Sequence, residues 1–283
     1  AGIDKTLSSA PGLTSMSTDG IDIGDLNFKI RLTQENTKKK TQVDLSVWDF
    51  AGQELYYTTH QFFLSDRALY IVVWNMAKKE EDSRVEYWLK SIDARAPDAP
   101  ILIVGTHSDH RICTKQHVEE TLKALENKYC TKYRNIQTIH TVSCANLEGI
   151  QKLDLWIQGI VVSQPYMGER IQRSFLELEK LCKQEKVKRT PPVVTWQEFS
   201  RFGFICNIKT QESLSAAAEW LHIMGSIVYF QKHEGLNDIV ILDPQWLTDV
   251  MSTIITTKHA FVKNGVLQHS DLPQLWRPPK FPP

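Results

Sequence analysis

The chain has 283 residues, of which 42% are hydrophobic and 23% charged, and its 33 basic residues balance its 33 acidic residues. This length suits two domains, each with its own buried core, and the neutral charge balance argues against a protein that binds nucleic acid or a membrane surface. No apolar run approaches the roughly 20 residues that a membrane-spanning helix requires.

The cysteines and the first residues indicate the compartment. The five cysteines form no CxxC pair and leave one odd, as is typical of reduced thiols in an intracellular protein and not of a disulfide framework or a zinc site. The first 20 residues contain no hydrophobic signal-peptide core. We therefore expect a cytoplasmic protein. Because the sequence does not begin with Met, we also expect it to be a piece of a longer chain with other domains.

Strands and helices alternate through the first half of the sequence. Residues 28–32 and 43–48 flank the polar segment NTKKK, which predicts a hairpin with NTKKK as its turn. Residues 68–74 read ALYIVVW, a continuous apolar run typical of a strand buried on both faces. The spacing of apolar residues further predicts a helix at 85–96, a strand at 99–106, a helix at 117–129, a strand at 136–144 and a helix at 147–161. This order indicates a mostly parallel sheet covered by helices on both faces.

The pattern changes near residue 163. A long amphipathic helix is expected at 171–186. The segment WQEFSRF at 196–202 follows, and the later elements expected are a helix at 213–225 that ends in Gly, short strands at 226–230 and 238–242, and a helix that begins after residue 243. Asp243 is suited to cap that last helix, with Pro244 in its first position. These elements outline a winged-helix-like α+β unit. The sequence thus predicts two domains, at residues 1–162 and 163–283.

Three of the predicted strands end in polar residues. Asp49 ends the second strand, Thr106 and Asp109 follow the strand ILIVG, and Ser143 follows the strand IQTIHTV. A single aspartate in such a place is usually a turn former or a helix cap. Ligands of doubly wound sheets, however, bind beyond the carboxyl ends of the strands. Three such ends on one sheet edge therefore predict a binding site.

The segment WDFAGQE at 48–54 resembles the DxxGQ element of small GTPases. In that class the aspartate reaches Mg²⁺ through water, the glycine amide contacts the γ-phosphate of GTP, and the glutamine orients the attacking water. The resemblance assigns these roles to Asp49, Gly52 and Gln53. The segment STDGID at 17–22 lies where the first switch is expected, and Thr18 would be the Mg²⁺-binding threonine.

Two further elements resemble the guanine-binding motifs of the same class. GTHSD resembles the element usually written NKxD, whose aspartate accepts both N–H groups of the guanine edge in a bidentate, charge-assisted contact. This assigns base recognition to Asp109, with Thr106 and His107 beside it. A His107 ring stacked beside the base is one possible role. Ser143, Cys144 and Ala145 resemble the SAK element. The usual Lys of that element is absent, because Asn146 follows Ala145.

The order of these motifs resembles the Roc–COR tandem of the ROCO proteins, the large GTPases that include the leucine-rich-repeat kinases. Three longer segments resemble the same tandem: WDFAGQELYYTTHQFF, FLSDRALYIVVWN and LDPQWL. The resemblance covers nearly the whole chain. It implies a Ras-like doubly wound sheet followed by a smaller winged-helix-like COR domain. It also implies GTP and GDP as ligands with Mg²⁺, a signalling switch, and a homodimer formed through COR. His60, next to the second switch, is predicted to be structural or a switch contact, and not catalytic.

One family element is missing. The phosphate-binding loop GxxxxGK[ST] needs a Gly–Lys pair, and none of the 13 glycines precedes a lysine. The family's first strand is missing with it. Three explanations stand: the sequence is a fragment that begins after the loop, the protein is a pseudo-GTPase scaffold that has lost nucleotide binding, or another chain completes the site. As given, the chain is not expected to hydrolyse GTP well.

Overall fold

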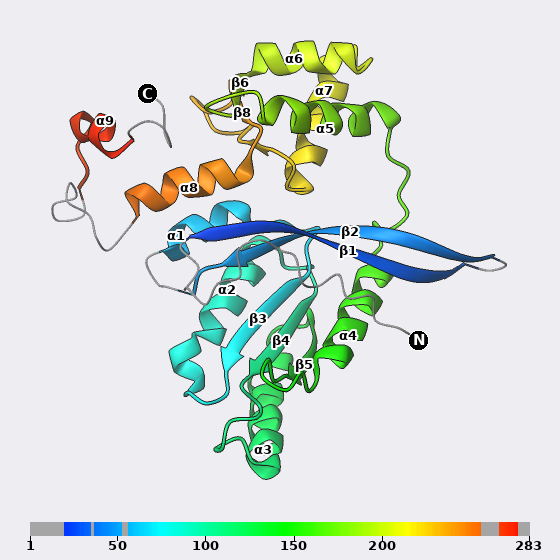
Figure 1. Cartoon of the computed structure of the whole chain (residues 1–283), viewed down its shortest axis with the longest axis vertical. Helices are drawn as coiled ribbons and strands as arrows, with labels where there is room; N and C mark the ends of the chain where they lie inside the picture. Colours follow the sequence, from blue (N-terminus) through cyan, green and yellow to red (C-terminus); the bar gives the residue numbers. More distant parts are fainter. Residues whose placement is uncertain (1–19, 35–36, 53–55, 256–265, 277–283) are drawn as a thin grey trace. The chain divides into compact units, whose positions relative to one another are not determined.

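The computed structural model describes residues 20–34, 37–52, 56–255 and 266–276 (Figure 1). The chain folds as two compact units. One contains the tip of an N-terminal hairpin and residues 61–170, and the other contains the base of that hairpin, the residues up to His60 and the part that begins at Ile171. Thr18 and Gln53 lie outside the described residues.

The N-terminal hairpin consists of β1 (Ile21–Gln34) and β2 (Thr37–Phe50), which form a two-stranded sheet. The hairpin was predicted, but the prediction that NTKKK forms its turn is wrong, because residues 37–40 belong to β2. Strand pairing uses backbone N–H and C=O groups, which every non-proline residue carries. A polar lysine run therefore continues a strand as well as an apolar run does.

The first unit is built on a parallel sheet of β3 (Tyr70–Asn75), β4 (Ile101–Thr106) and β5 (Ile136–Thr141), in the order β3-β4-β5. Its helices are α2 (Val85–Arg95), α3 (Lys115–Leu125), continued by a π-helical turn (Glu126–Cys130), and α4 (Ile150–Ser163). Two 3-10 turns, η3 (Gln61–Phe63) and η4 (Glu80–Ser83), precede β3 and α2. The alternation predicted from the sequence is confirmed.

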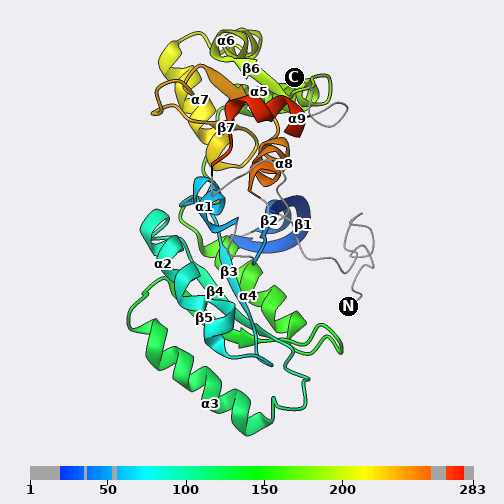
Figure 2. The same cartoon turned by 90° about the vertical axis from the view of Figure 1, so that its left-hand side faces the viewer.

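The two faces of this sheet carry separate cores. Val72, Trp74 and Ile103 pack with α2 and α3 on one face, whereas Leu102 and Val104 pack with α4 on the other (Figure 2). Successive residues of a strand point to opposite faces, so one apolar run supplies both cores.

The prediction that β3 is buried on both faces is wrong. Ile71 and Val73 are 41% and 53% exposed, while Val72 and Trp74 are buried. The two exposed residues point toward the face that carries α4, where the buried cluster is formed by Leu102, Val104, Val142 and Ile160 and does not include them. Among the described strands, β3 pairs only with β4. The apolar run therefore covers one core and leaves its other face open in the part of the chain that the structure describes.

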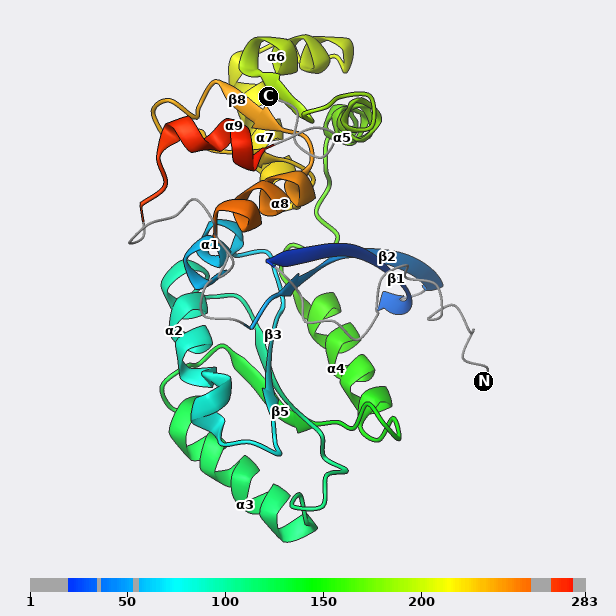
Figure 3. The same cartoon turned by 60° about the vertical axis from the view of Figure 1, so that its left-hand side comes forward.

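The second unit contains α5 (Arg173–Lys186), β6 (Val193–Thr195), α6 (Trp196–Ile205), α7 (Gln211–Ile223), β7 (Val228–Tyr229), β8 (Ile239–Ile241) and α8 (Pro244–Ile254). The strands form an antiparallel sheet in the order β6-β8-β7, and Figure 3 shows α6 and α7 beside it. The short helices α1 (Tyr57–His60), η6 (His269–Asp271) and α9 (Leu272–Leu275) complete the described elements of this unit. Strand β6 was missed by sequence analysis because it has only three residues and follows two prolines.

Leu178, Phe199 and Leu221 lie at the centre of the core of this unit, without solvent exposure. The predicted cap is confirmed: the Asp243 carboxylate accepts a hydrogen bond from the Gln245 amide, with Pro244 in the first turn of α8. In the part of the chain described here, no helix combines the length and apolar character needed to cross a membrane.

Candidate functional site

The end of β4 holds Thr106 and His107 in a fixed arrangement. The Thr106 hydroxyl donates to the carbonyl oxygen of Trp74 at 3.2 Å and lies 2.9 Å from Nδ1 of His107. The tautomer of His107 decides which of the two groups donates in the second contact. The His107 backbone has a φ of 62°, in the left-handed region that few side chains adopt. The exposed His107 ring therefore starts from a constrained backbone position.

Ser143 joins the loop after β5 to the loop after β4. Its side chain is fully buried, and its Oγ accepts hydrogen bonds from the amides of Ala145 at 3.2 Å and Asn146 at 3.3 Å. Its hydroxyl bonds to the Asp109 carboxylate. The backbone ties the same loops together, since the Ser108 amide donates to the Val142 carbonyl oxygen at 3.2 Å. The two predicted guanine motifs are thus one structural unit.

The electrostatics keep Asp109 ionised. The hydrogen bond from Ser143 and one from its own backbone hold the pKa of Asp109 below its ordinary value, and nearby His107 and His110 add to this effect. The carboxylate is exposed. An anchored carboxylate of this kind can accept two N–H groups of a planar ligand edge.

The loop that presents Cys144 and Ala145 is tightly closed. The Ser143 amide donates to the Glu148 carbonyl oxygen at 2.9 Å, and Gly149 has a φ of 80°. A Cβ atom on Gly149 would lie 2.3 Å from the Thr141 carbonyl oxygen, so only glycine fits this turn. Cys144 and Ala145 remain exposed at the tip of the loop.

Asp49 and Gly52 lie at the end of β2, in the other unit. Both are exposed. The Ala51 amide between them donates to the Gly20 carbonyl oxygen at 2.9 Å, and the Gly52 carbonyl oxygen accepts a hydrogen bond from the Tyr57 hydroxyl at 3.1 Å. The structure places the sequence-predicted residues in two sheets: Asp49 and Gly52 follow the hairpin, whereas the base-recognition residues follow the parallel sheet. The prediction that the three strand ends share one edge of one sheet is therefore wrong for the strands that the structure describes.

The predicted metal contact can be compared with the chemistry of Mg²⁺. Among the residues that the structure describes, no group of three or more His, Cys, Asp or Glu side chains could hold a metal ion. Mg²⁺ usually keeps several waters and takes one or two protein carboxylates together with phosphate oxygens. The exposed Asp49 fits that limited role. A Mg²⁺ site at Asp49 and Thr18 remains a prediction.

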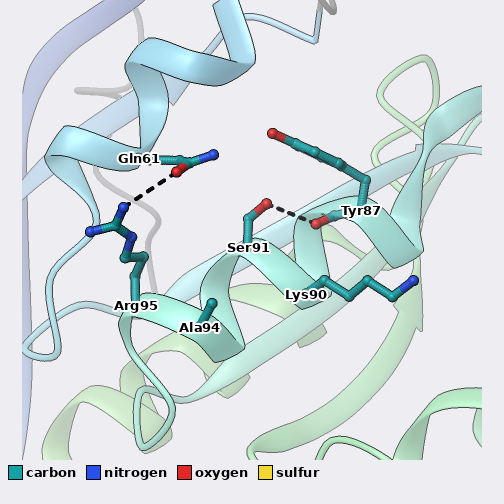
Figure 4. A pocket seen from close by; sticks show the side chains of 6 residues that line it. All are labelled: Gln61, Tyr87, Lys90, Ser91, Ala94 and Arg95. Atoms are coloured by element: carbon teal, nitrogen blue, oxygen red, sulfur yellow. Dashed lines mark hydrogen bonds between the residues drawn. The ribbon is translucent and has the colours of Figure 1, made fainter.

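A shallow pocket of about 280 Å³ lies elsewhere, on the surface of α2 and η3 (Figure 4). Its lining residues are Gln61, Tyr87, Lys90, Ser91, Ala94 and Arg95. Arg95 Nη2 donates to Gln61 Oε1 at 3.4 Å, and the Ser91 hydroxyl donates to the Tyr87 carbonyl oxygen at 2.9 Å. No residue predicted to contact nucleotide lines this pocket, so it is separate from the candidate site.

The fold and the joined loops define a class of protein: a Ras-like α/β domain followed by a winged-helix-like α+β domain. Comparisons with known families agree with this class. The family model described as "Ras of Complex, Roc, domain of DAPkinase" matches residues 6–109, and the model described as "C-terminal of Roc, COR-A domain" matches residues 173–283. The chain belongs to the ROCO family and carries its Roc and COR-A domains in tandem.

Several relatives share this tandem region. The chain is 48% identical over 287 residues to the probable serine/threonine-protein kinase pats1 of Dictyostelium discoideum, an alignment that covers 99% of this chain and 9% of that protein. It is 38% identical to cyclic GMP-binding protein C of the same organism, over 96% of this chain and 10% of that protein. It is 30% identical to mouse leucine-rich repeat serine/threonine-protein kinase 1, over 84% of this chain and 13% of that protein. The chain therefore spans only about a tenth of these relatives.

A solved structure has the same fold. The Methanosarcina barkeri Roco2 RocCORdC structure, bound to GDP, matches with a TM-score of 0.71 and 28% sequence identity. The match covers 92% of this chain and 73% of that chain. The predicted fold class and family are confirmed.

Proposed function

We propose that the protein containing this chain binds guanine nucleotide and acts as a GTP-hydrolysing signalling switch. The observation that carries the proposal is the bond between Ser143 and Asp109, which fixes an exposed carboxylate beside the loop at Cys144 and Ala145. The GDP bound to Methanosarcina barkeri Roco2 supports the ligand class. The proposal places the Roc domain within residues 1–162 and COR within 163–283.

Each site residue has a chemical role in this proposal. Asp109 accepts the guanine N–H groups, Thr106 and His107 shape the pocket beside the base, and the backbone of residues 143–145 contacts the guanine oxygen. On the phosphate side, Gly52 donates its amide to the γ-phosphate and Gln53 orients the attacking water. Asp49 and Thr18 would hold Mg²⁺, which would supply positive charge against the phosphates.

The remaining parts of the proposal concern the longer protein. GTP would order the two switch segments, hydrolysis would release them, and COR would relay the change and support a homodimer in the cytoplasm. The sequence contains no Gly–Lys pair, so the proposal requires that a phosphate-binding loop comes from residues beyond this chain. The same observation favours an alternative function, a non-enzymatic scaffold without nucleotide binding.

Binding of a fluorescent GTP analogue with Mg²⁺ tests the choice. We compare this chain with a longer form of the protein that includes a GxxxxGK[ST] loop. Binding by the longer form alone, with turnover of GTP, supports the switch. Failure of both to bind supports the scaffold and removes the catalytic role of Gln53.

Asp109→Asn in the longer form tests base recognition. A hydrogen bond to a charged group contributes about 1.5–3 kcal/mol, so the loss of the bidentate contact should weaken competition by GTP roughly 100-fold while competition by ATP stays weak. The matched control is Asp98→Asn, an exposed aspartate between α2 and β4. If Asp109→Asn keeps full preference for GTP, Asp109 does not read the base.

A further inference from the structure

Helix α8 of the COR-A domain contacts the start of strand β1 in the same compact unit (Figures 1 and 3). The side chain of Gln245 makes the contact. Its Nε2 donates to the Ile21 carbonyl oxygen at 2.9 Å, and its Oε1 accepts from the Ile23 amide at 2.8 Å. One carboxamide therefore binds two backbone groups of β1 that lie 222 and 224 residues away in sequence.

The contact lies on the edge of β1 that faces away from β2. The Gly20 carbonyl oxygen accepts from the Ala51 amide, at the base of the hairpin. Gly20 precedes β1, whereas the Ile21 carbonyl oxygen and the Ile23 amide belong to the strand and lie on the same side of it, and both are bound by Gln245. Gln245 thus occupies the place where a neighbouring strand would pair with β1.

The carboxamide is itself held in place. Its Nε2 also donates to Asp249 Oδ1 at 2.9 Å, which uses the second amide proton. The same Nε2 lies 3.0 Å from the hydroxyl oxygen of the buried Thr248, and that hydroxyl lies 3.3 Å from the Ile21 carbonyl oxygen. A side chain with this many fixed partners loses little additional freedom when it binds β1.

The backbone around the contact leaves little room for movement. Gly20 has a φ of 82°, and a Cβ atom there would lie 3.4 Å from the Ser252 Cβ of α8. At the end of β2, next to Asp49, the Trp48 ring lies against Gly225, where an added Cβ would be 3.0 Å from the ring. Both strands of the hairpin base therefore touch the COR-A domain beside the predicted switch segments.

We propose that Gln245 is a positioning residue that couples the nucleotide state of the Roc domain to COR-A by clamping the backbone of Ile21 and Ile23. The inference rests on the proposed function, because it needs two nucleotide states. Ile21 lies in the segment 17–22 that sequence analysis assigned to the first switch. A change in this segment alters the edge that Gln245 binds, and by thermodynamic linkage the clamp alters the relative affinities for GTP and GDP.

The first test measures the clamp without nucleotide. In the full-length protein, Gln245→Leu removes both bonds to β1, and the Ile23 amide should exchange with deuterium about tenfold faster. The matched control is Gln197→Leu, an exposed glutamine on α6 of the same unit, which should leave the exchange rate unchanged. An unchanged rate in Gln245→Leu would show that the clamp does not hold β1, and the inference would fail.

The second test measures coupling. Gln245→Leu should change the ratio of the GTP and GDP dissociation constants of the full-length protein about tenfold, and Gln197→Leu should not. Gln245→Asn, whose shorter carboxamide does not reach β1, should behave as the leucine variant does. If the Ile23 amide exchanges faster but the ratio of the GTP and GDP dissociation constants is unchanged, the contact is merely structural and the proposed coupling is wrong. If the unaltered protein binds neither nucleotide, the proposed function fails and the coupling with it, while the exchange result still reports on the clamp.

Discussion

His60 gives the protein a predictable sensitivity to acid. Its ring is 1% exposed and lies among Phe50, Tyr56 and Tyr57, with ring centroids 5.0, 6.4 and 6.3 Å away. Burial disfavours the charged imidazolium and lowers the pKa of His60 from 6.5 to about 4, while a backbone hydrogen bond at Gly20 acts in the opposite direction.

The sign of the effect comes from proton linkage. At pH 7 the residue is mainly neutral in both states, so it contributes little pH dependence there. Between pH 6.5 and pH 4 the unfolded chain binds a proton that the folded chain does not, so stability falls as the pH falls. With about 1.4 kcal/mol per pKa unit, the loss attributable to His60 is about 2 kcal/mol at pH 5 and approaches about 3 kcal/mol below pH 4.

The assay compares urea unfolding of the parent chain and of His60→Phe at pH 7 and pH 5. The variant keeps an aromatic ring but cannot be protonated, so its unfolding free energy should fall by about 2 kcal/mol less over this range than that of the parent chain. His117→Gln, which changes an exposed histidine of α3, controls for the loss of a titratable ring. Equal losses in the parent chain and His60→Phe would refute the reasoning.

Three further substitutions test the site and the two cores. Ser143→Ala should weaken guanine-nucleotide binding about tenfold in a nucleotide-binding form of the protein, because it frees the Asp109 carboxylate that we propose binds the base; an unchanged dissociation constant would contradict this. Gly105→Ala should destabilise its unit by about 1–3 kcal/mol in chemical denaturation, since the new Cβ would lie 2.7 Å from the Trp74 ring. Thr195→Ala should cost about 1 kcal/mol by removing the capping box with Glu198, and circular dichroism melting of the variant measures it.

Much of the local structure could be predicted from the sequence because it depends on neighbouring residues. The spacing of Leu89 and Ile92 on α2 and the cap at Asp243 are local patterns, and the structure has them where they were predicted. Two of the failures also have local causes. Residues 37–40 appeared to form a turn because they are polar, and β6 was too short to leave a pattern.

The sequence alone therefore determined the family, the order of the elements and the residues at the strand ends. The tertiary structure decided which of these residues touch. Ser143 bonds to Asp109 because β4 and β5 are neighbours in a parallel sheet, and Gln245 reaches β1 because the chain returns to it after more than 200 residues. The periodic spacing of apolar residues predicts which face of an element is apolar, but it does not predict which distant backbone will lie against that face.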